Sequence, residues 1–189
     1  MELTYVTGNK YKIELAQRIL GPLGVTIKQK KIYCPEIQDN EIENVSKFSA
    51  KYAADKLNEA VIKNDSGLII EGLNGFPGPY TAYVEDTLTE EGILKLMQGV
   101  ENRNAYFVEV ISYCEPGKEP VSFVSKTHGS IANEKRGEYG WSYDRIFVPK
   151  GEVKTLAEFE DDERWKFWTD DAYLLLKDYV EKKTSNIEL

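Results

Sequence analysis

Histidine and cysteine are scarce in this sequence, which contains one His, His128, and two Cys, Cys34 and Cys114. The single His excludes metal sites built from several histidines, and any Ser-His-Asp triad would have to use it. We interpret His128, which falls in a predicted strand, as a structural or surface residue. The two Cys stand far apart and form no CxxC pair, so we interpret them as reduced, buried or half-buried thiols.

Basic residues and long apolar runs are scarce as well. The 189 residues include 24 Lys and Arg and 32 Asp and Glu, which gives a net charge of −8. This acidic balance argues against a protein that binds a nucleic acid polymer. No apolar run approaches the ~20 residues that span a bilayer. The N-terminus lacks the basic-then-apolar pattern of a signal peptide. We therefore expect a cytoplasmic protein that does not associate with membranes.

Strand and helix patterns alternate first, and a β-hairpin follows. We expect strands at residues 3–7, 25–33, 61–63, 68–70, 105–114, 121–130 and 146–148, and helices after Asn9 and at 44–60, 90–98 and 161–183. Taken alone, residues 64–67 are typical of an Asx turn. The order predicts an α/β fold with a mixed, partly antiparallel central sheet flanked by helices. We expect one elongated domain over residues 1–189, with a cleft between two lobes.

The segment TGNKYK at residues 7–12 lies where the first strand turns into a helix. The free N–H groups of a helix start, its dipole and the Lys12 ammonium suit an anion such as phosphate. A plain turn is the alternative, and the Walker pattern GxxxxGK[ST] is absent.

Two carboxylates follow predicted strands. Glu36 lies just past the second strand, and Asp65 lies at the end of the third. Each would be ordinary on its own, as a solvated Glu and an Asx turn. If the two meet across a cleft, they can hold Mg²⁺, which prefers hard oxygen ligands, and a water can be activated for attack on phosphorus.

These segments and several others resemble one known family. In chain order they are TGNKYK at 7–12, PEIQ at 35–38, DSGL at 65–68, GFPGPYT at 75–81, GWSYD at 140–144 and TLAE at 155–158. Over residues 3–158 the chain resembles the inosine triphosphate pyrophosphatase family, whose members act on noncanonical purine nucleoside triphosphates. Each segment is weak alone, and their common order carries the resemblance.

The resemblance implies an activity and the residues that perform it. A nucleoside triphosphate would be hydrolysed between its α and β phosphates, giving a monophosphate and pyrophosphate, with Mg²⁺ or else Mn²⁺ as cofactor. Glu36 and Asp65 would be metal ligands, and Asp65 would also be the catalytic carboxylate. The phosphates would bind to Thr7, Gly8, Asn9, Lys12, Lys51 and Ser66. Family members are usually homodimers, which implies a homodimer here.

The sequence departs from the family at three places. Asn64 stands where the family usually has Asp or Glu, so either metal binding weakens or the general base is Asp65 or Glu71 alone. In the aromatic loop, residues 140–145, Ser142 replaces Gly and Arg145 replaces Pro. Because Ser adopts positive φ less cheaply than Gly, the loop is expected to be reshaped. The base-reading Ser-His-Arg of the family's last helical region is absent from the sequence.

Base preference therefore does not carry over from the family. By position, the base and sugar pocket would comprise Trp141, Ser142, Tyr143, Asp144, Arg164, Trp168, Thr169 and Asp170. In one explanation Asp170 accepts from an exocyclic amino group, since a carboxylate cannot donate to a keto oxygen, and Trp165 or Trp168 stacks on the base. In the other, both Trp residues pack in the core, the tail is an ordinary amphipathic helix and base reading is loose or lost.

The leading hypothesis is thus a nucleoside triphosphate pyrophosphohydrolase. The alternatives are a pyrophosphatase with a different base preference, a catalytically weak nucleotide-binding homologue, and an interaction domain. In the last case the expected nucleotide cleft would bind a protein partner instead.

Overall fold

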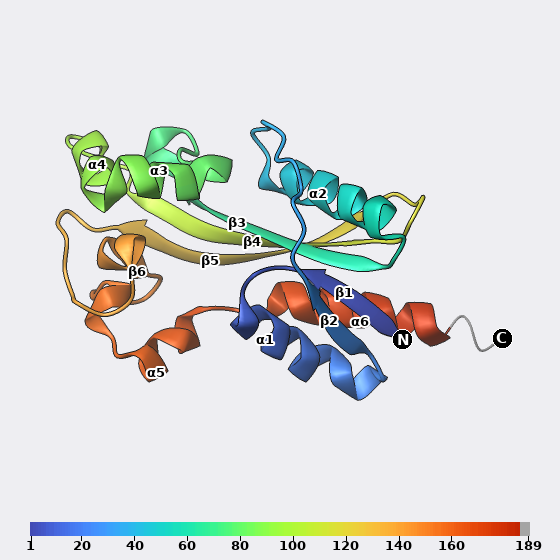
Figure 1. Ribbon diagram of the computed structural model, residues 1–189. Helices are drawn as coiled ribbons and strands as arrows, with labels where there is room; N and C mark the ends of the chain where they lie inside the picture. The colour runs from blue at the N-terminus through green and yellow to red at the C-terminus, as the bar shows by residue number, and fades with distance from the viewer. Residues whose placement is uncertain (186–189) are drawn as a thin grey trace. The chain divides into compact units, whose positions relative to one another are not determined.

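The computed structural model describes residues 1–185 (Figure 1). Its strands are β1 Glu2–Val6, β2 Thr26–Lys30, β3 Val61–Ile70, β4 Asn104–Cys114, β5 Val121–Ile131 and β6 Phe147–Pro149. Its α-helices are α1 Lys10–Leu20, α2 Ile42–Leu57, α3 Thr81–Thr87, α4 Thr89–Leu96, α5 Asp161–Arg164 and α6 Asp171–Ser185. None of the helices among these residues is long and apolar enough to cross a membrane.

The six strands form one mixed sheet in the order β2-β1-β3-β4-β5-β6. β1 pairs in parallel with both β2 and β3, whereas β5 and β6 are antiparallel. β4 and β5 are neighbours joined only by residues 115–120, so they form the expected hairpin. The predicted α/β fold with a mixed sheet and flanking helices is confirmed.

The chain divides into two compact units. Within the described residues, unit one comprises residues 1–65, 109–125 and 170–185, and unit two comprises residues 66–108 and 126–169. The boundaries fall within β3, β4 and β5, so each of these strands contributes residues to both units.

Unit one has helices on both faces of its strands, as Figure 1 shows for α1 and α6 on one side and α2 on the other. Alternation along β1 explains this, because successive side chains point to opposite faces. Leu3 and Tyr5 join one buried cluster with α1 and α6, and Val6 joins another with α2. The first cluster also contains Leu15, Ala16, Leu20, Ala172, Tyr173, Leu176 and Val180.

Unit two has its own core, in which aromatic side chains are prominent. The second half of β3 contributes Leu68 and Ile70, and helices α3 and α4 contribute Val84 and Ile93. The Phe107 ring lies 4.8 Å from that of Phe147 and 5.0 Å from that of Trp168, measured between centroids. These contacts set the position of the segment that leads from α5 toward α6.

Two expectations about elements were wrong. Residues 64–67 are no turn but part of β3, which runs unbroken from Val61 to Ile70. Ladder pairing to neighbouring strands outweighs the local turn preference of these residues.

The expected helix at 161–183 is interrupted. It consists of α5, a short 3₁₀ turn and then α6, with Trp168 extended at φ −88° and ψ 137° between them. The interruption coincides with the point where the chain leaves unit two for unit one, because Trp168 packs in the core of the former and α6 in that of the latter. The helix α3 was not foreseen in the sequence.

Candidate active site

The segment between β1 and α1 forms the expected strand-to-helix turn. Asn9 is the N-cap residue of α1, and its side-chain oxygen accepts from the N–H groups of Tyr11 at 2.9 Å and Lys12 at 3.4 Å. The Thr7 hydroxyl oxygen accepts from the N–H of Asn9 at 3.1 Å. Gly8 and Asn9 are exposed. The cap thus fixes the start of α1, and phosphate binding by Thr7, Gly8 and Asn9 stays a prediction.

The Lys12 ammonium is part of a polar cluster in unit one. It donates to the side-chain oxygen of Asn64 in β3, and the Asn64 amide nitrogen donates to a carboxylate oxygen of Glu109 in β4 at 2.7 Å. Burial lowers the pKa of Lys12, whereas the nearby negative charges of Glu109 and Asp65 act to raise it. The cation is therefore held among acidic and amide groups rather than in water.

Glu109 is a residue that sequence reasoning missed. It lies in the middle of a strand whose other residues are mostly apolar or aromatic, and a charge at such a position is a signal for a functional or paired group. Burial raises the pKa of Glu109, and Asp170 adds to this effect. The charge of Lys12 and the hydrogen bond from Asn64 act in the opposite direction.

Two tyrosines and an ion pair lie around the same cluster. The hydroxyls of Tyr5 and Tyr173 are 2.8 Å apart in the core of unit one, and burial, with the charge of Glu109 adding to it, raises the pKa of both. Asp170 pairs with Arg18 of α1 at 3.3 Å. The Asp170 carboxylate therefore already has a cationic partner within unit one, and its expected contact with a base stays a prediction.

The expected metal ligands also lie in unit one. Glu36 is exposed in residues 31–41, which connect β2 to α2, and Asp65 is half-buried in β3. The positive charge of Lys63 helps to lower the pKa of Lys12. Burial raises the pKa of Cys34; the charge of Lys63 opposes this rise, and the charge of Glu36 adds to it. Lys63 is thus an electrostatic neighbour of both the Lys12 cluster and the segment that carries Glu36.

The donor chemistry of Glu36 and Asp65 suits Mg²⁺, which takes carboxylate oxygens and keeps several waters. Within residues 1–185, no group of three or more His, Cys, Asp and Glu side chains is arranged to hold a metal ion. A site made by these two carboxylates would complete its coordination with water and phosphate oxygens.

The two other expected phosphate ligands lie in different elements. Lys51 of α2 contacts the turn between β4 and β5, where it donates to the carbonyl oxygen of Lys118 at 3.3 Å, and it pairs with Asp55 at 3.5 Å. Ser66 is exposed in β3 and belongs to unit two. The phosphate contacts of Lys51 and Ser66 stay predictions.

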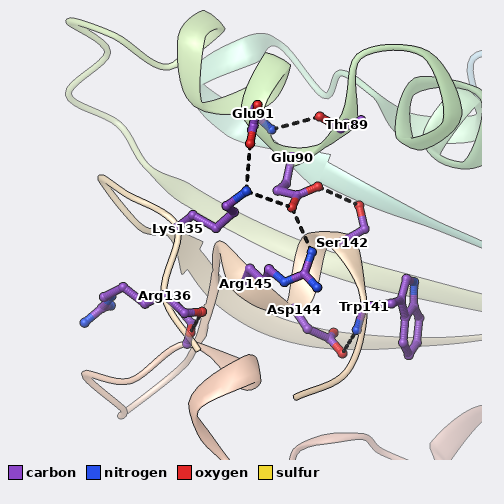
Figure 2. Close-up of polar contacts among 10 residues, drawn as sticks. Thr89, Glu90, Glu91, Lys135, Arg136, Trp141, Ser142, Asp144 and Arg145 are labelled. Atoms are coloured by element: carbon purple, nitrogen blue, oxygen red, sulfur yellow. Dashed lines mark hydrogen bonds and ion pairs between the residues drawn. The ribbon is translucent and has the colours of Figure 1, made fainter. Parts of the chain in front are cut away.

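In unit two, Asp144 is one of the two most enclosed of the expected pocket residues, together with Tyr143. The Asp144 side chain is 2% exposed, it accepts from the Trp141 N–H at 3.3 Å, and it lies 3.5 Å from Nη1 of Arg164 (Figure 2 shows Asp144 and Trp141). Burial raises the Asp144 pKa to about 6, although the hydrogen bond and Arg164 oppose the rise. A Cβ at Gly140 would lie 2.0 Å from the Asp144 carboxylate, so this position requires glycine.

Ser142, in the aromatic loop, has a positive φ of +30°. Such a backbone costs about 1–2 kcal/mol in a non-glycine residue. Figure 2 shows what holds the loop: Glu90 of α4 accepts from Arg145 at 3.1 Å and from the Ser142 hydroxyl at 3.4 Å, and Lys135 lies 3.7 Å from Glu90. Arg145 thus ties the loop to α4.

The remaining pocket candidates divide between core and surface. Trp168 is half-buried against Phe107, as the core-packing interpretation predicts, whereas Trp165 is 44% exposed. Tyr143 is buried, and its hydroxyl donates to the carbonyl oxygen of Thr81 at 3.1 Å. Thr169 is half-buried at the end of unit two.

Arg164 is buried, and its Nη2 donates to Asp161 at 2.6 Å. No acceptor among the described residues makes a hydrogen bond to its Nη1. A buried guanidinium donor of this kind is suited to an additional acceptor.

Comparison with known proteins agrees with this arrangement. A sequence model of the Ham1 family matches residues 3–168. A dITP/XTP pyrophosphatase of Methanopyrus kandleri is 48% identical over 166 residues, which are 88% of each chain. The dITP/XTP pyrophosphatase of Methanothermobacter marburgensis is 36% identical over 189 residues, covering 100% of both chains.

Solved structures give the same result. The structure of the Staphylococcus aureus Ham1 protein covers 97% of this chain and 100% of its own, with a TM-score of 0.84 and 28% identity. The matched range ends at Trp168, so Thr169 and Asp170 of the expected base and sugar pocket lie just beyond it. The chain belongs to the Ham1 family, which confirms the resemblance found in its motifs.

Proposed function

We propose that this protein is a Mg²⁺-dependent nucleoside triphosphate pyrophosphohydrolase that releases pyrophosphate and a nucleoside monophosphate. The observation that carries the proposal is the hydrogen bond from the Lys12 ammonium, in the first turn of α1, to Asn64 of β3, the residue before Asp65. Relatives of 36–48% identity bear the name of this reaction. A cation for the phosphates and a carboxylate for the metal are the groups that such a hydrolysis needs.

The proposal assigns a role to each of the expected residues. Lys12, with Thr7, Gly8 and Asn9, binds the phosphates at the start of α1, and Lys51 and Ser66 add to this binding. Glu36 and Asp65 hold the metal, and Asp65 also orients the attacking water. When bound, Mg²⁺, or Mn²⁺ in its place, neutralises phosphate charge and makes water more acidic.

The substrate class is a purine triphosphate with a keto group at position 6, as the relatives' name dITP/XTP pyrophosphatase suggests. The family's Ser-His-Arg is missing from this chain, so a different donor must reach the keto oxygen. In our proposal that donor is Arg164, whose buried Nη1 makes no hydrogen bond among the described residues and lies 3.5 Å from the Asp144 carboxylate, its ion-pair partner. The rest of the base and sugar pocket is the set of residues expected from the sequence.

The first experiment measures pyrophosphate release from dITP, ITP, XTP, dATP, ATP and GTP with Mg²⁺. We expect turnover of the first three and at least tenfold lower kcat/KM for dATP and ATP, because a site built to hydrogen-bond a keto group discriminates against a 6-amino group in its place. GTP, which has a 6-keto group and an added 2-amino group, tests whether the pocket also excludes that amino group.

Asp65→Asn tests the carboxylate. We expect kcat to fall about 10²–10³-fold, the range seen when a group that stabilises transition-state charge is removed. Asp178→Asn, an exposed carboxylate on α6, is the matched control and should leave kcat unchanged. Chelation by EDTA should abolish turnover, and added Mg²⁺ should restore it.

Absence of pyrophosphate from every triphosphate, with Mg²⁺ and with Mn²⁺, would overturn the proposal. Calorimetric binding of a nucleotide without turnover would then favour a catalytically weak homologue. The homodimer and the cytoplasmic location belong to the same proposal; sedimentation equilibrium of the purified chain and fractionation of cells test them.

A further inference from the structure

The hydrogen bonds from Lys12 through Asn64 to Glu109 permit only one orientation of the Asn64 amide. An ammonium only donates, and an ionised carboxylate only accepts. Asn64 therefore has to present its oxygen to Lys12 and its nitrogen to Glu109, which is the arrangement observed. Turning the amide over would place two donors against each other and two acceptors against each other.

Burial makes this arrangement consequential. Asn64 and Glu109 are half-buried, so few waters are available to replace a lost partner. The groups that act electrostatically on Glu109 are Lys12, Asn64 and Asp170. The charges of Asp65 and Lys63 act in addition on Lys12. Arg18 pairs with Asp170, which reduces the charge that Asp170 directs at the cluster.

We propose that Glu109 is a positioning residue for the reaction: through Asn64 it holds the Lys12 ammonium where the substrate's phosphates bind. The inference rests on the proposed function. It also accounts for the amide side chain at position 64. The carboxylate is placed on the adjacent strand β4, and an amide connects it to the lysine.

The test exchanges the two groups. Glu109→Gln removes the charge that orients Asn64 while keeping the shape of the side chain. Asn64→Asp places a second carboxylate against Glu109. In the double variant N64D/E109Q, the Gln amide can donate to the new carboxylate, which accepts from Lys12. That variant therefore restores both hydrogen bonds and the original net charge.

We expect each single variant to raise KM for the best triphosphate about tenfold or more, with a smaller change in kcat, because Lys12 contributes to ground-state phosphate binding. The double variant should return KM to within about threefold of the wild type. Glu43→Gln is the control, because it removes another carboxylate of unit one that bonds to Lys47 and Ser122.

A second cycle asks whether Glu109 acts through Lys12. In a Lys12→Met background, E109Q should change KM less than twofold, since the lysine to be positioned is gone. Urea unfolding of every variant separates folding from binding. If N64D does not fold, E109Q in the wild-type and Lys12→Met backgrounds still decides.

The outcomes separate the two proposals. A wild-type protein that releases no pyrophosphate overturns the proposed function and the role of Glu109 with it. An active wild type in which E109Q keeps its KM within twofold overturns the positioning role alone. So does a pattern in which the variants change only in urea stability.

Discussion

Individual residues in this protein are held in environments that local sequence does not reveal, and Asp144 is the clearest case. It stands in an exposed-looking aromatic loop, yet its carboxylate is enclosed by Gly140, the Trp141 N–H and Arg164. Because burial is the main cause of its raised pKa, the folded state favours the protonated acid more than the unfolded chain does.

This predicts a pH dependence of stability. The Asp144 pKa is about 6 in the folded state against an ordinary value of 3.8, so the folded state binds more protons between these values. The contribution of Asp144 to the free energy of unfolding is therefore most favourable below pH 4 and is lost as pH rises through about 6. Relative to Asp144→Asn, the wild type should lose about 2 kcal/mol of unfolding free energy between pH 4.5 and 7.5.

Urea unfolding of both proteins at four pH values in that range measures the difference. Only the change of the difference with pH is used, because the substitution also alters the contact with Arg164. Two curves that stay parallel would contradict the assignment of the raised pKa to Asp144.

Among the elements, α6 shows how a simple apolar stripe determines packing. The spacing of Tyr173, Leu176, Tyr179 and Val180 predicts an apolar stripe on one helix face. Tyr173, Leu176 and Val180 are buried in the core of unit one with α1 and β1, and Tyr179 packs against that core half-buried. The neighbouring Leu175 is 47% exposed on the same helix.

Leu176→Ala should lower the unfolding free energy by about 3 kcal/mol, because it removes buried methyl groups and leaves a cavity. Leu175→Ala is the matched control and should cost less than about 1 kcal/mol. Urea denaturation at pH 7 reads both values. Equal losses would mean that the two leucines are equally buried in solution.

In β3, unlike in α6, the local sequence pattern does not predict the structure. The sequence at 64–67 favours a turn, but the strand continues through it, and this places Asn64 and Asp65 in a ladder beside neighbouring strands. Local preference could not foresee this result, because the hydrogen bonds that hold the strand come from β1 and β4, which are distant in sequence.

At the scale of the whole molecule, an acidic chain is proposed to bind a polyphosphate. The net charge of −8 gives no general attraction for such a ligand, so binding has to come from local cations such as Lys12 and from a bound metal. A ligand that binds only the folded state must also stabilise it.

A nonhydrolysable triphosphate analogue with Mg²⁺, at about 100 times its dissociation constant, should add about 2.7 kcal/mol of stability. For a chain of this length that corresponds to a rise in Tm of roughly 5–10 °C. Differential scanning calorimetry measures the shift, and Mg²⁺ alone is the control. An unchanged Tm would favour the interaction-domain alternative.

The sequence by itself determined the family, the α/β class, the hairpin, the apolar stripe of α6 and the motifs that contain Lys12 and Asp65. These follow from periodicity and from short segments whose chemistry is local. Only the tertiary structure decided the continuity of β3, the break between α5 and α6, the enclosure of Asp144 and the place of Glu109. Each depends on partners far away along the chain, and the burial and hydrogen bonds that those partners provide outweigh local preference.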